Sequence, residues 1–142
     1  EKKLRIEDAL SATKSASKEG IVIGGGCALI SCIPEVKALA NSLCGDEKSG
    51  AEIVAAALES PLRQIAKNAG VDDGVVLNNV MLNLDKNTGY NALTDTYENM
   101  FESGIIDPTK VARCALENAG SVAASILTTD VIVTDISEST KL

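Results

Sequence analysis

The stretch "EGIVIGGGCALISC", residues 19–32, places three consecutive glycines between a short β-branched run and a segment that favours helix. A dinucleotide-binding βαβ unit requires G-x-G-x-x-G after a buried strand. Gly24 and Gly26 fit its first two positions, but the third falls on Leu29, whose side chain would obstruct close packing of helix on strand. The upstream run is very short, and the remaining chain has a helical pattern. A dinucleotide-dependent oxidoreductase is therefore the weakest of the function hypotheses.

The glycine triplet still carries information about what approaches the backbone. Without a Cβ atom, glycine lets a flat or charged ligand come close to the main chain. A tight connection between two helices requires the same residue type. The triplet alone is therefore compatible with a ligand-binding turn and with a purely structural one.

Composition limits the class of protein. The chain has 142 residues, of which 45% are apolar and only 2% aromatic, so its core is expected to consist of small and branched side chains. The formal charge of -7 and the lack of Trp provide neither the positive field nor the stacking surface of a nucleic-acid-binding protein. No apolar run reaches the ~18 residues of a membrane span. The chain opens on "EKKLRIEDAL", without an initiator Met, and is expected to be part of a longer protein.

The lack of His and the spacing of the Cys residues limit the catalytic and metal-binding chemistry of this chain. The sequence contains no His, which excludes Ser–His–Asp and Cys–His catalysis and any His-ligated metal within this chain. The four cysteines have neither CxxC nor zinc-site spacing, and we interpret them as reduced thiols in a cytosol-like compartment. They are Cys27, Cys32, Cys44 and Cys114. No metal site is predicted from the residues of this chain.

Periodicity and turn residues predict a mainly helical chain. An amphipathic helix over residues 1–18 ends at Gly20. Further helices are expected over 27–43, interrupted near Pro34, over 50–58, over 61–68, and after Asp73 as N-cap. The last and clearest helix is capped by Asp107, has Pro108 in its first turn, and is apolar on nearly every side, which predicts a central position.

Two polar stretches separate these helices. "CGDEKSG" (44–50) is interpreted as a loop, and "DKNTGYNALTD" (85–95) as a break rich in turn residues. "DVIVTDI" (130–136) predicts one terminal strand. Because a single strand cannot form a sheet, this segment is expected to pair with a strand outside the chain.

Six consecutive blocks together resemble the group I chaperonins, the GroEL family of bacteria, mitochondria and plastids. The resemblance extends over essentially the whole chain, in order, and is much more specific than any single block. The blocks are "LRIEDALSAT", "EGIVIGGGCAL", "SPLRQIAKNAG", "GYNALTDTYENM", "SGIIDPTKVARCALENAGSVAASILTTD" and "VIVTDI".

The resemblance implies where the chain belongs in such a subunit. Residues 1–19 match the C-terminal helix of the intermediate domain, and residues 20–142 match the C-terminal half of the equatorial ATP-binding domain. The implied fold class is mainly α, a partial equatorial helical bundle with one short C-terminal β-strand. The apical domain and the phosphate-binding loop with its magnesium-coordinating aspartate would lie before Glu1.

The resemblance also implies site residues. Asp8, in "RIEDAL", matches the aspartate that activates the attacking water in ATP hydrolysis, a role suited to a carboxylate because phosphoryl transfer requires an oriented water. Without the resemblance, Asp8 would be interpreted as a solvated carboxylate on a helix face. Gly25 matches the glycine that contacts the nucleotide.

Two further segments match the nucleoside side of the family's site. Asn91, Ala92 and Leu93, in "GYNALTD", match the residues that meet the adenine. The family often has alanine where this chain has Leu93, so a backbone contact is expected there. Asp107 matches the residue that hydrogen-bonds the ribose, and its two oxygens can divide this role with helix capping.

The hypotheses differ in class. The first is an ATP-dependent folding chaperone, with Mg²⁺ held mainly by residues outside this chain; the alternative is a non-catalytic helical assembly or scaffold module. The resemblance implies a heptameric ring of subunits, with the co-chaperonin and non-native polypeptides bound through the absent apical domain. It also implies a plastid stroma, a mitochondrial matrix or a bacterial cytoplasm.

Overall fold

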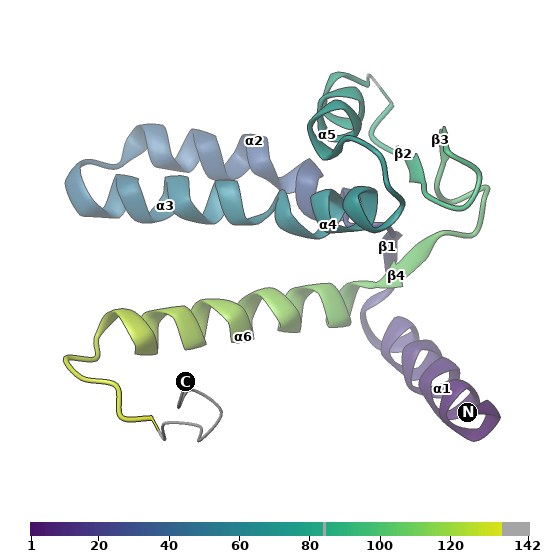
Figure 1. The fold of residues 1–142 in the computed structure, drawn as a ribbon, viewed down its shortest axis with the longest axis horizontal. Helices are drawn as coiled ribbons and strands as arrows, with labels where there is room; N and C mark the ends of the chain where they lie inside the picture. The colour runs from purple at the N-terminus through teal and green to yellow at the C-terminus, as the bar shows by residue number, and fades with distance from the viewer. Residues whose placement is uncertain (84, 135–142) are drawn as a thin grey trace, which may run out of the picture. The chain divides into compact units, whose positions relative to one another are not determined.

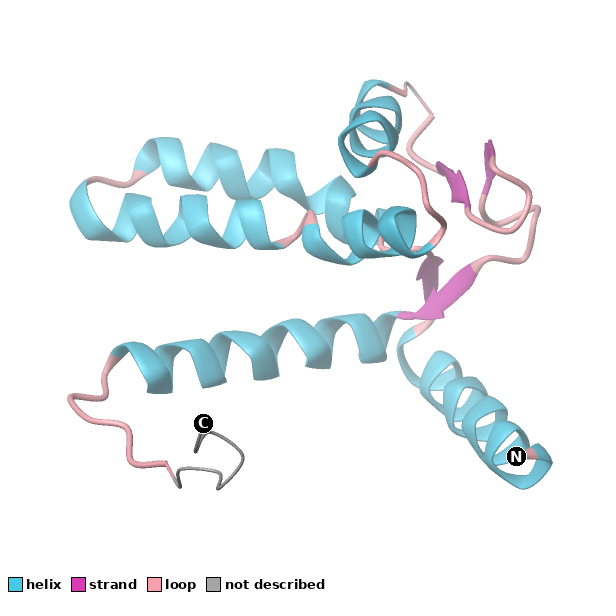
Figure 2. Cartoon of the chain, viewed as in Figure 1, coloured by secondary structure: helices cyan, strands magenta, loops and turns pink. Residues whose placement is uncertain are grey.

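The computed structural model describes residues 1–83 and 85–134. The chain divides into two compact units, Glu1–Ala112 and Arg113–Leu142. Helices account for most of the described residues, which confirms the mainly α fold class (Figure 2). The helices are α1 (Lys2–Glu19), α2 (Cys27–Ser42), α3 (Gly45–Ala57), α4 (Ser60–Asn68), α5 (Asp73–Leu82) and α6 (Thr109–Leu127).

Several helix ends follow the local sequence signals. α1 ends at Gly20, which has φ 81° and donates its backbone N–H to the Ala16 carbonyl at 2.8 Å. α4 carries Pro61 in its first turn, where the missing proline N–H is not needed. α2, in contrast, continues through Pro34 without the predicted interruption, although this leaves one backbone bond in the helix unmade.

Two predicted helix starts are wrong. α3 begins at Gly45, so most of the expected loop over residues 44–50 is helical. Asp46 and Glu47 lie in its first turn, where carboxylates interact favourably with the helix dipole. The N-cap of α5 is Asp72, whose side chain accepts a hydrogen bond from the Val75 amide at 2.9 Å; the prediction had assigned this role to Asp73.

The strands form two separate antiparallel pairs. Neither pair is predicted from the sequence. β1 (Ile21–Ile23) pairs with β4 (Ile106–Pro108), and β2 (Thr88–Asn91) pairs with β3 (Thr96–Asn99) (Figure 1). The sequence indicates only a very short β-branched run at residues 21–23 and a turn-rich break over residues 85–95. Because a dinucleotide-binding unit requires parallel strands, the oxidoreductase hypothesis is wrong.

The predicted C-terminal strand is not formed in the described part of its range. Residues 131–134 are exposed and have no strand assignment, while Asp135 and Ile136 lie outside the described residues. Among the described residues, no strand pairs with this segment, and an isolated strand lacks ladder bonds. The expectation that it pairs with a strand beyond this chain stays a prediction.

The core lies in the first unit, where α2, α4 and α5 meet the two strand pairs. Its most deeply buried side chains are Ile33, Leu62, Met100 and Cys27. As expected from the composition, it consists mainly of branched and small residues, with Tyr90 as its aromatic member. The cluster comprises Ile23, Cys27, Ile30, Ile33, Leu58, Leu62, Ala66, Val76, Leu77, Tyr90 and Met100. This core holds the glycine turn between β1 and α2.

Two helices of this chain contribute nothing to the buried core. Neither α1 nor α6 has a buried residue. The central position expected for α6 stays a prediction. Both carry apolar side chains that face solvent: Leu4, Ile6, Leu10, Val111, Leu116, Val122, Ile126 and Leu127.

An ion-pair cluster ties α4 to α5. Arg63 donates to Asp73 Oδ2 at 2.7 Å and to Glu59 Oε2 through Nη2 and Nε, at 2.9 and 3.0 Å. The hydrogen bond from Arg63 holds the pKa of the Asp73 carboxyl below its ordinary value. The cluster therefore links the stability of this helix pair to pH.

We expect acid to weaken this link in a defined direction. Because the folded-state pKa of Asp73 is lowered, the stabilisation is present above the unfolded-state pKa of about 4 and is lost as the pH falls towards the folded-state value. Asp73→Asn should lower the thermal unfolding temperature at pH 7 and flatten its fall between about pH 5 and pH 3. Thermal unfolding followed by circular dichroism tests this, with Glu35→Gln as the control on an exposed carboxylate. An unchanged pH profile in Asp73→Asn would contradict it.

Candidate functional site

The glycine turn connects β1 to α2, and its outer two glycines are required by the chain's own packing. The Gly24 amide donates to the Ile105 carbonyl at 2.9 Å, and a Cβ at Gly24 would lie 3.1 Å from that same backbone group. A Cβ at Gly26, where φ is +78°, would lie only 2.9 Å from the backbone nitrogen of Leu62. A larger residue at Gly26 would collide with backbone, and one at Gly24 would require a small shift of the Ile105 backbone.

Gly25 is different from its two neighbours. Its φ of +64° favours glycine, but a Cβ there would meet only the mobile tip of Met100, at 3.0 Å, and the Tyr90 carbonyl oxygen, at 3.8 Å. The main chain at Gly25 is therefore the part of the turn that is not closed off by backbone of this chain. On the side where a Cβ would lie, however, Gly25 faces the buried Met100 side chain and the Tyr90 carbonyl, so a ligand would meet its backbone from another side.

Asn91 ends β2 and uses its side chain to organise the following turn. Its Oδ1 accepts a hydrogen bond from the Leu93 amide at 2.9 Å, and its Nδ2 donates to Glu98 across the hairpin. Ala92 and Leu93 are exposed, Leu93 to 93%. Because the side-chain amide of Asn91 is hydrogen-bonded within the hairpin, the turn presents backbone groups and apolar side chains to a ligand.

Asp107 lies in β4, directly opposite Val22 of β1. Since α6 begins at Thr109, the predicted N-cap role for Asp107 is wrong: strand pairing holds its backbone, and Pro108 precedes the helix. Within residues 1–83 and 85–134, the Asp107 carboxylate makes no hydrogen bond or ion pair. The carboxylate is thus available to a hydroxyl donor.

The buried thiol of Cys27 connects these segments. Burial raises the pKa of Cys27, the Tyr90 backbone amide lowers it, and the negative charge of Asp107 raises it further. A Cβ at Gly89 would lie 2.6 Å from the Cys27 sulfur. The glycine turn and β2 therefore pack around one side chain at the start of α2, and Asp107 lies in the strand that pairs with β1. The residues present offer a backbone cradle, an exposed turn and an unpaired carboxylate, which together suit a nucleoside.

The remaining predicted residue is not brought to this place. Asp8 is an exposed side chain on α1, twelve residues before Gly20, which corresponds to about 18 Å along a helix axis. No hydrogen bond or ion pair to Asp8 occurs in the described part of the chain. Its approach to the other residues depends on the direction that α1 takes at Gly20.

Sequence reasoning missed the residues that bring the segments together. Gly89 and Met100 pack on Cys27 and on the glycine turn, and Tyr90 lies between that turn and the hairpin. A usable signal was present, because Tyr90 and Tyr97 flank a stretch of turn residues, which is a hairpin pattern.

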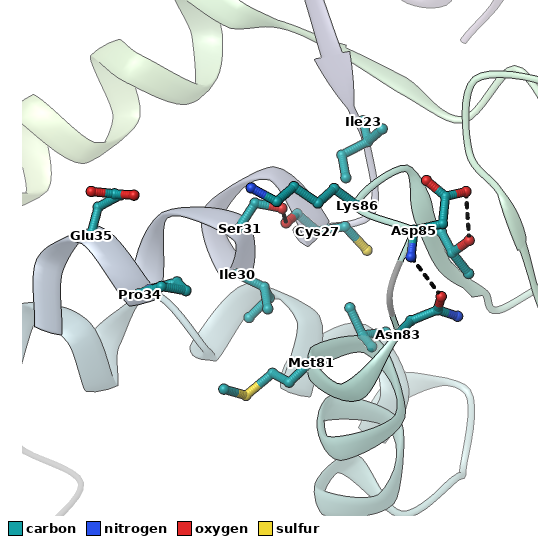
Figure 3. A pocket seen from close by; sticks show the side chains of 12 residues that line it. Ile23, Cys27, Ile30, Ser31, Pro34, Glu35, Met81, Asn83, Asp85 and Lys86 are labelled. Carbon is teal, nitrogen blue, oxygen red and sulfur yellow. Dashed lines mark hydrogen bonds between the residues drawn. The ribbon is translucent and has the colours of Figure 1, made fainter. Parts of the chain in front are cut away.

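A pocket of about 280 Å³ lies beside the glycine turn and is lined by none of the six predicted residues. Figure 3 shows its wall on α2, with Cys27, Ile30 and Ser31, and the segment that carries Asn83 and Asp85. Several of its polar groups are already paired: the Asp85 amide donates to Asn83 Oδ1, and Ser31 donates to the Cys27 carbonyl. We therefore do not assign the nucleoside to it.

The described residues include neither a metal-binding cluster nor a membrane-spanning helix. Residues 1–83 and 85–134 contain no group of three or more Cys, Asp or Glu side chains that could hold a metal ion. Over the same ranges, no helix is both long enough and apolar enough to cross a membrane.

Comparison with known proteins gives one consistent result. Residues 1–137 match the TCP-1/cpn60 chaperonin family. The chain is 56% identical over 139 residues to the chloroplastic RuBisCO large subunit-binding protein subunit beta of Secale cereale, covering 97% of this chain and 28% of that protein. The chain thus spans about 28% of the length of this relative.

Comparison with solved structures also finds chaperonins. A group III chaperonin in the open state is 31% identical with a TM-score of 0.77, over 84% of this chain and 25% of that one. An open-state group II chaperonin monomer from Methanococcoides burtonii is 27% identical with a TM-score of 0.72, over 77% and 28%. The chaperonin resemblance is confirmed: this chain belongs to the TCP-1/cpn60 chaperonin family.

Proposed function

We propose that the chain is the C-terminal part of a subunit of an ATP-dependent chaperonin that assists protein folding. Residues 1–19 form the last helix of the intermediate domain, and residues 20–142 form the second half of the equatorial domain. The observation that supports this most strongly is that Gly25 and Gly89 pack around Cys27 and Met100, next to Tyr90, while Asp107 lies in the strand that pairs with β1. Asp107 follows Gly25 by 82 residues in the sequence, yet β4 pairs with β1, the strand that leads into the glycine turn.

Each side chain then has a role that fits its surroundings. The backbone at Gly25 lies against the nucleotide. Ala92 and Leu93 contact the adenine through the exposed turn, and the Asp107 carboxylate accepts a hydrogen bond from a ribose hydroxyl. Asp8 orients the attacking water once α1 is directed towards the phosphates.

The phosphate side of this site lies outside the chain. Bound Mg²⁺ neutralises phosphate charge during phosphoryl transfer, and we assign its ligands mainly to the segments that would precede Glu1. The residues of this chain bind the nucleoside, exclude water from the base, and position one carboxylate.

Partners and compartment follow from the same assignment. We propose a ring of seven subunits, with the co-chaperonin and non-native polypeptides held by an apical domain that this chain does not contain. Because the relative from Secale cereale is chloroplastic, the plastid stroma is our first choice of compartment, ahead of the mitochondrial matrix and the bacterial cytoplasm.

Removal of the ribose contact should weaken nucleotide binding. In the complete subunit, Asp107→Ala should raise the ATP dissociation constant about tenfold or more, since a hydrogen bond to a charged group is lost. Isothermal titration with ATP measures this, and Glu102→Gln is a matched control on an exposed carboxylate of the preceding turn. Unchanged affinity in Asp107→Ala would contradict the assignment of the ribose.

The chain by itself should not hydrolyse ATP. It lacks the phosphate loop, and stabilisation of phosphate charge supplies most of the catalysis in phosphoryl transfer. A steady-state phosphate-release assay on the purified 142-residue chain tests this expectation. Turnover that disappears in Asp8→Ala would show that the chain alone is an ATPase.

A non-catalytic assembly module is the second candidate, and the exposed apolar side chains of α1 and α6 favour it. Apolar faces of this kind mark contacts with other protein surfaces. If Asp107→Ala leaves ATP affinity unchanged while Val122→Asp on α6 prevents subunits from assembling, as measured by light scattering, this second function is the better one.

A further inference from the structure

We propose that Tyr90 and Asp95 are positioning residues for the nucleoside: their hydrogen bond closes the turn over residues 92–95 and sets both the affinity and the selectivity for the base. This inference rests on the proposed function, in which the same turn meets the adenine. Neither residue needs to touch the nucleotide.

Tyr90 contacts three parts of the site at once. Its side chain is buried, with 3% exposure, in the cluster that also contains Cys27 and Met100. Its carbonyl oxygen lies on the side of Gly25 where a Cβ would be, at 3.8 Å, and its amide faces the Cys27 sulfur. Its hydroxyl group donates to Asp95 Oδ1 at 2.9 Å. Tyr90 therefore joins the glycine turn to the far end of the hairpin turn.

Asp95 has the backbone conformation that this hydrogen bond requires. Its φ is 55°, and it is the one non-glycine residue with a positive φ among residues 1–83 and 85–134. Aspartate tolerates this region better than most side chains, but the conformation still needs support from its surroundings. The bond from Tyr90 gives that support, and a contact of 2.7 Å between the hydroxyl oxygens of Thr94 and Thr96 lies beside it.

The position of this bond determines its effect. Tyr90 immediately precedes Asn91, and Asp95 closes the turn, so the bond spans the residues proposed to meet the adenine. When it is lost, Asn91 still holds the Leu93 amide, but the other end of the turn is released from the core. A turn that samples several positions binds a flat base more weakly and distinguishes adenine from guanine less well, because ordering it on binding costs free energy.

The test uses the complete subunit with four variants and one control. Tyr90→Phe removes the hydroxyl, Asp95→Gly removes the acceptor while permitting the positive φ, and the double variant closes a thermodynamic cycle. Asp95→Asn keeps an acceptor oxygen and tolerates the same φ, so it should restore binding. Tyr97→Phe is the matched control, because its hydroxyl bonds Asn79 of α5 rather than the turn.

Dissociation constants for ATP and GTP and the turnover number at saturating ATP are measured for each variant. We expect Tyr90→Phe and Asp95→Gly each to raise the ATP dissociation constant roughly three- to tenfold, with no further loss in the double variant. The preference for ATP over GTP should fall, and the turnover number should change less than about twofold, since neither side chain is near the reacting phosphate. A variant that is merely less folded would instead lose turnover.

The variant Asp107→Ala distinguishes failure of this inference from failure of the proposed function. If Asp107→Ala weakens ATP binding but Tyr90→Phe and Asp95→Gly do not, the proposed function holds and this inference is wrong. The inference is also overturned if Tyr97→Phe has the same effect as Tyr90→Phe, or if Asp95→Asn fails to restore binding. If none of the variants affects ATP binding, the proposed function has failed, and the inference fails with it.

Discussion

Replacement of Asp8 by alanine in the complete subunit should lower the rate of ATP hydrolysis about 10²–10⁴-fold and leave the ATP dissociation constant within about threefold. A group that orients the attacking water acts mainly in the transition state, so its loss affects turnover rather than affinity. Asp8 is exposed on α1, twelve residues before Gly20, and is not among the residues proposed to contact the nucleoside. The nucleoside contacts therefore remain when its carboxylate is removed.

Single-turnover hydrolysis and nucleotide titration on the same preparation measure the two effects separately. Glu7→Gln is the matched control, since Glu7 is the adjacent exposed carboxylate on α1 and forms an ion pair with Lys3 at 3.6 Å. Asp8→Asn keeps the shape of the side chain and should be nearly as slow as Asp8→Ala. A loss confined to affinity, or an equal loss of rate in Glu7→Gln, would contradict the role of Asp8.

The second large effect concerns stability rather than chemistry. Gly26→Ala should destabilise the folded protein by about 2–4 kcal/mol, from the cost of a positive φ together with overpacking. The new Cβ would lie 2.9 Å from the Leu62 backbone nitrogen, and Leu62 is fully buried at the start of α4. Because backbone atoms inside a packed core cannot move aside, α2 and α4 would have to separate.

Gly25→Ala provides the contrast. It shares the positive φ, but its Cβ meets only the flexible tip of Met100, so its destabilisation should be about 1 kcal/mol. Its main effect should appear as weaker ATP binding, because a Cβ pressed against the buried Met100 side chain would shift the backbone that is proposed to contact the nucleotide. Chemical unfolding together with ATP titration measures both quantities. If Gly26→Ala were as stable as Gly25→Ala, the close contact between the glycine turn and α4 would be wrong.

Local signals in the sequence predicted the helices well. Gly20 ends α1 because its positive φ breaks the helical backbone, and Pro61 starts α4 because the first turn does not require its N–H. The start of α3 was wrong because this helix begins after Cys44 without a side-chain cap, so no capping residue marks it in the sequence. At α5, Asp72 and Asp73 are equivalent by residue type, and only the fold shows that Asp73 is held by Arg63.

Pairing between distant segments could not be obtained from local patterns. β1 and β4 are three residues each and lie more than 80 residues apart, so neither has a pattern of its own. This pairing moved Asp107 from a helix cap to a strand. The resemblance to chaperonins supplied the candidate residues Gly25, Asn91 and Asp107, but the linking role of Tyr90 and Asp95 emerged from their contacts.

Photolabelling of the complete subunit with azido-adenosine triphosphate tests most directly whether this chain holds the base of ATP. After irradiation and tryptic digestion, we expect label in the peptide spanning residues 87–110, at residues 91–93, and we expect excess ATP to prevent it. Asp107→Ala should reduce this labelling at limiting nucleotide. Nucleotide-protected label found only in peptides outside residues 87–110 would contradict the assignment of the adenine site to this chain.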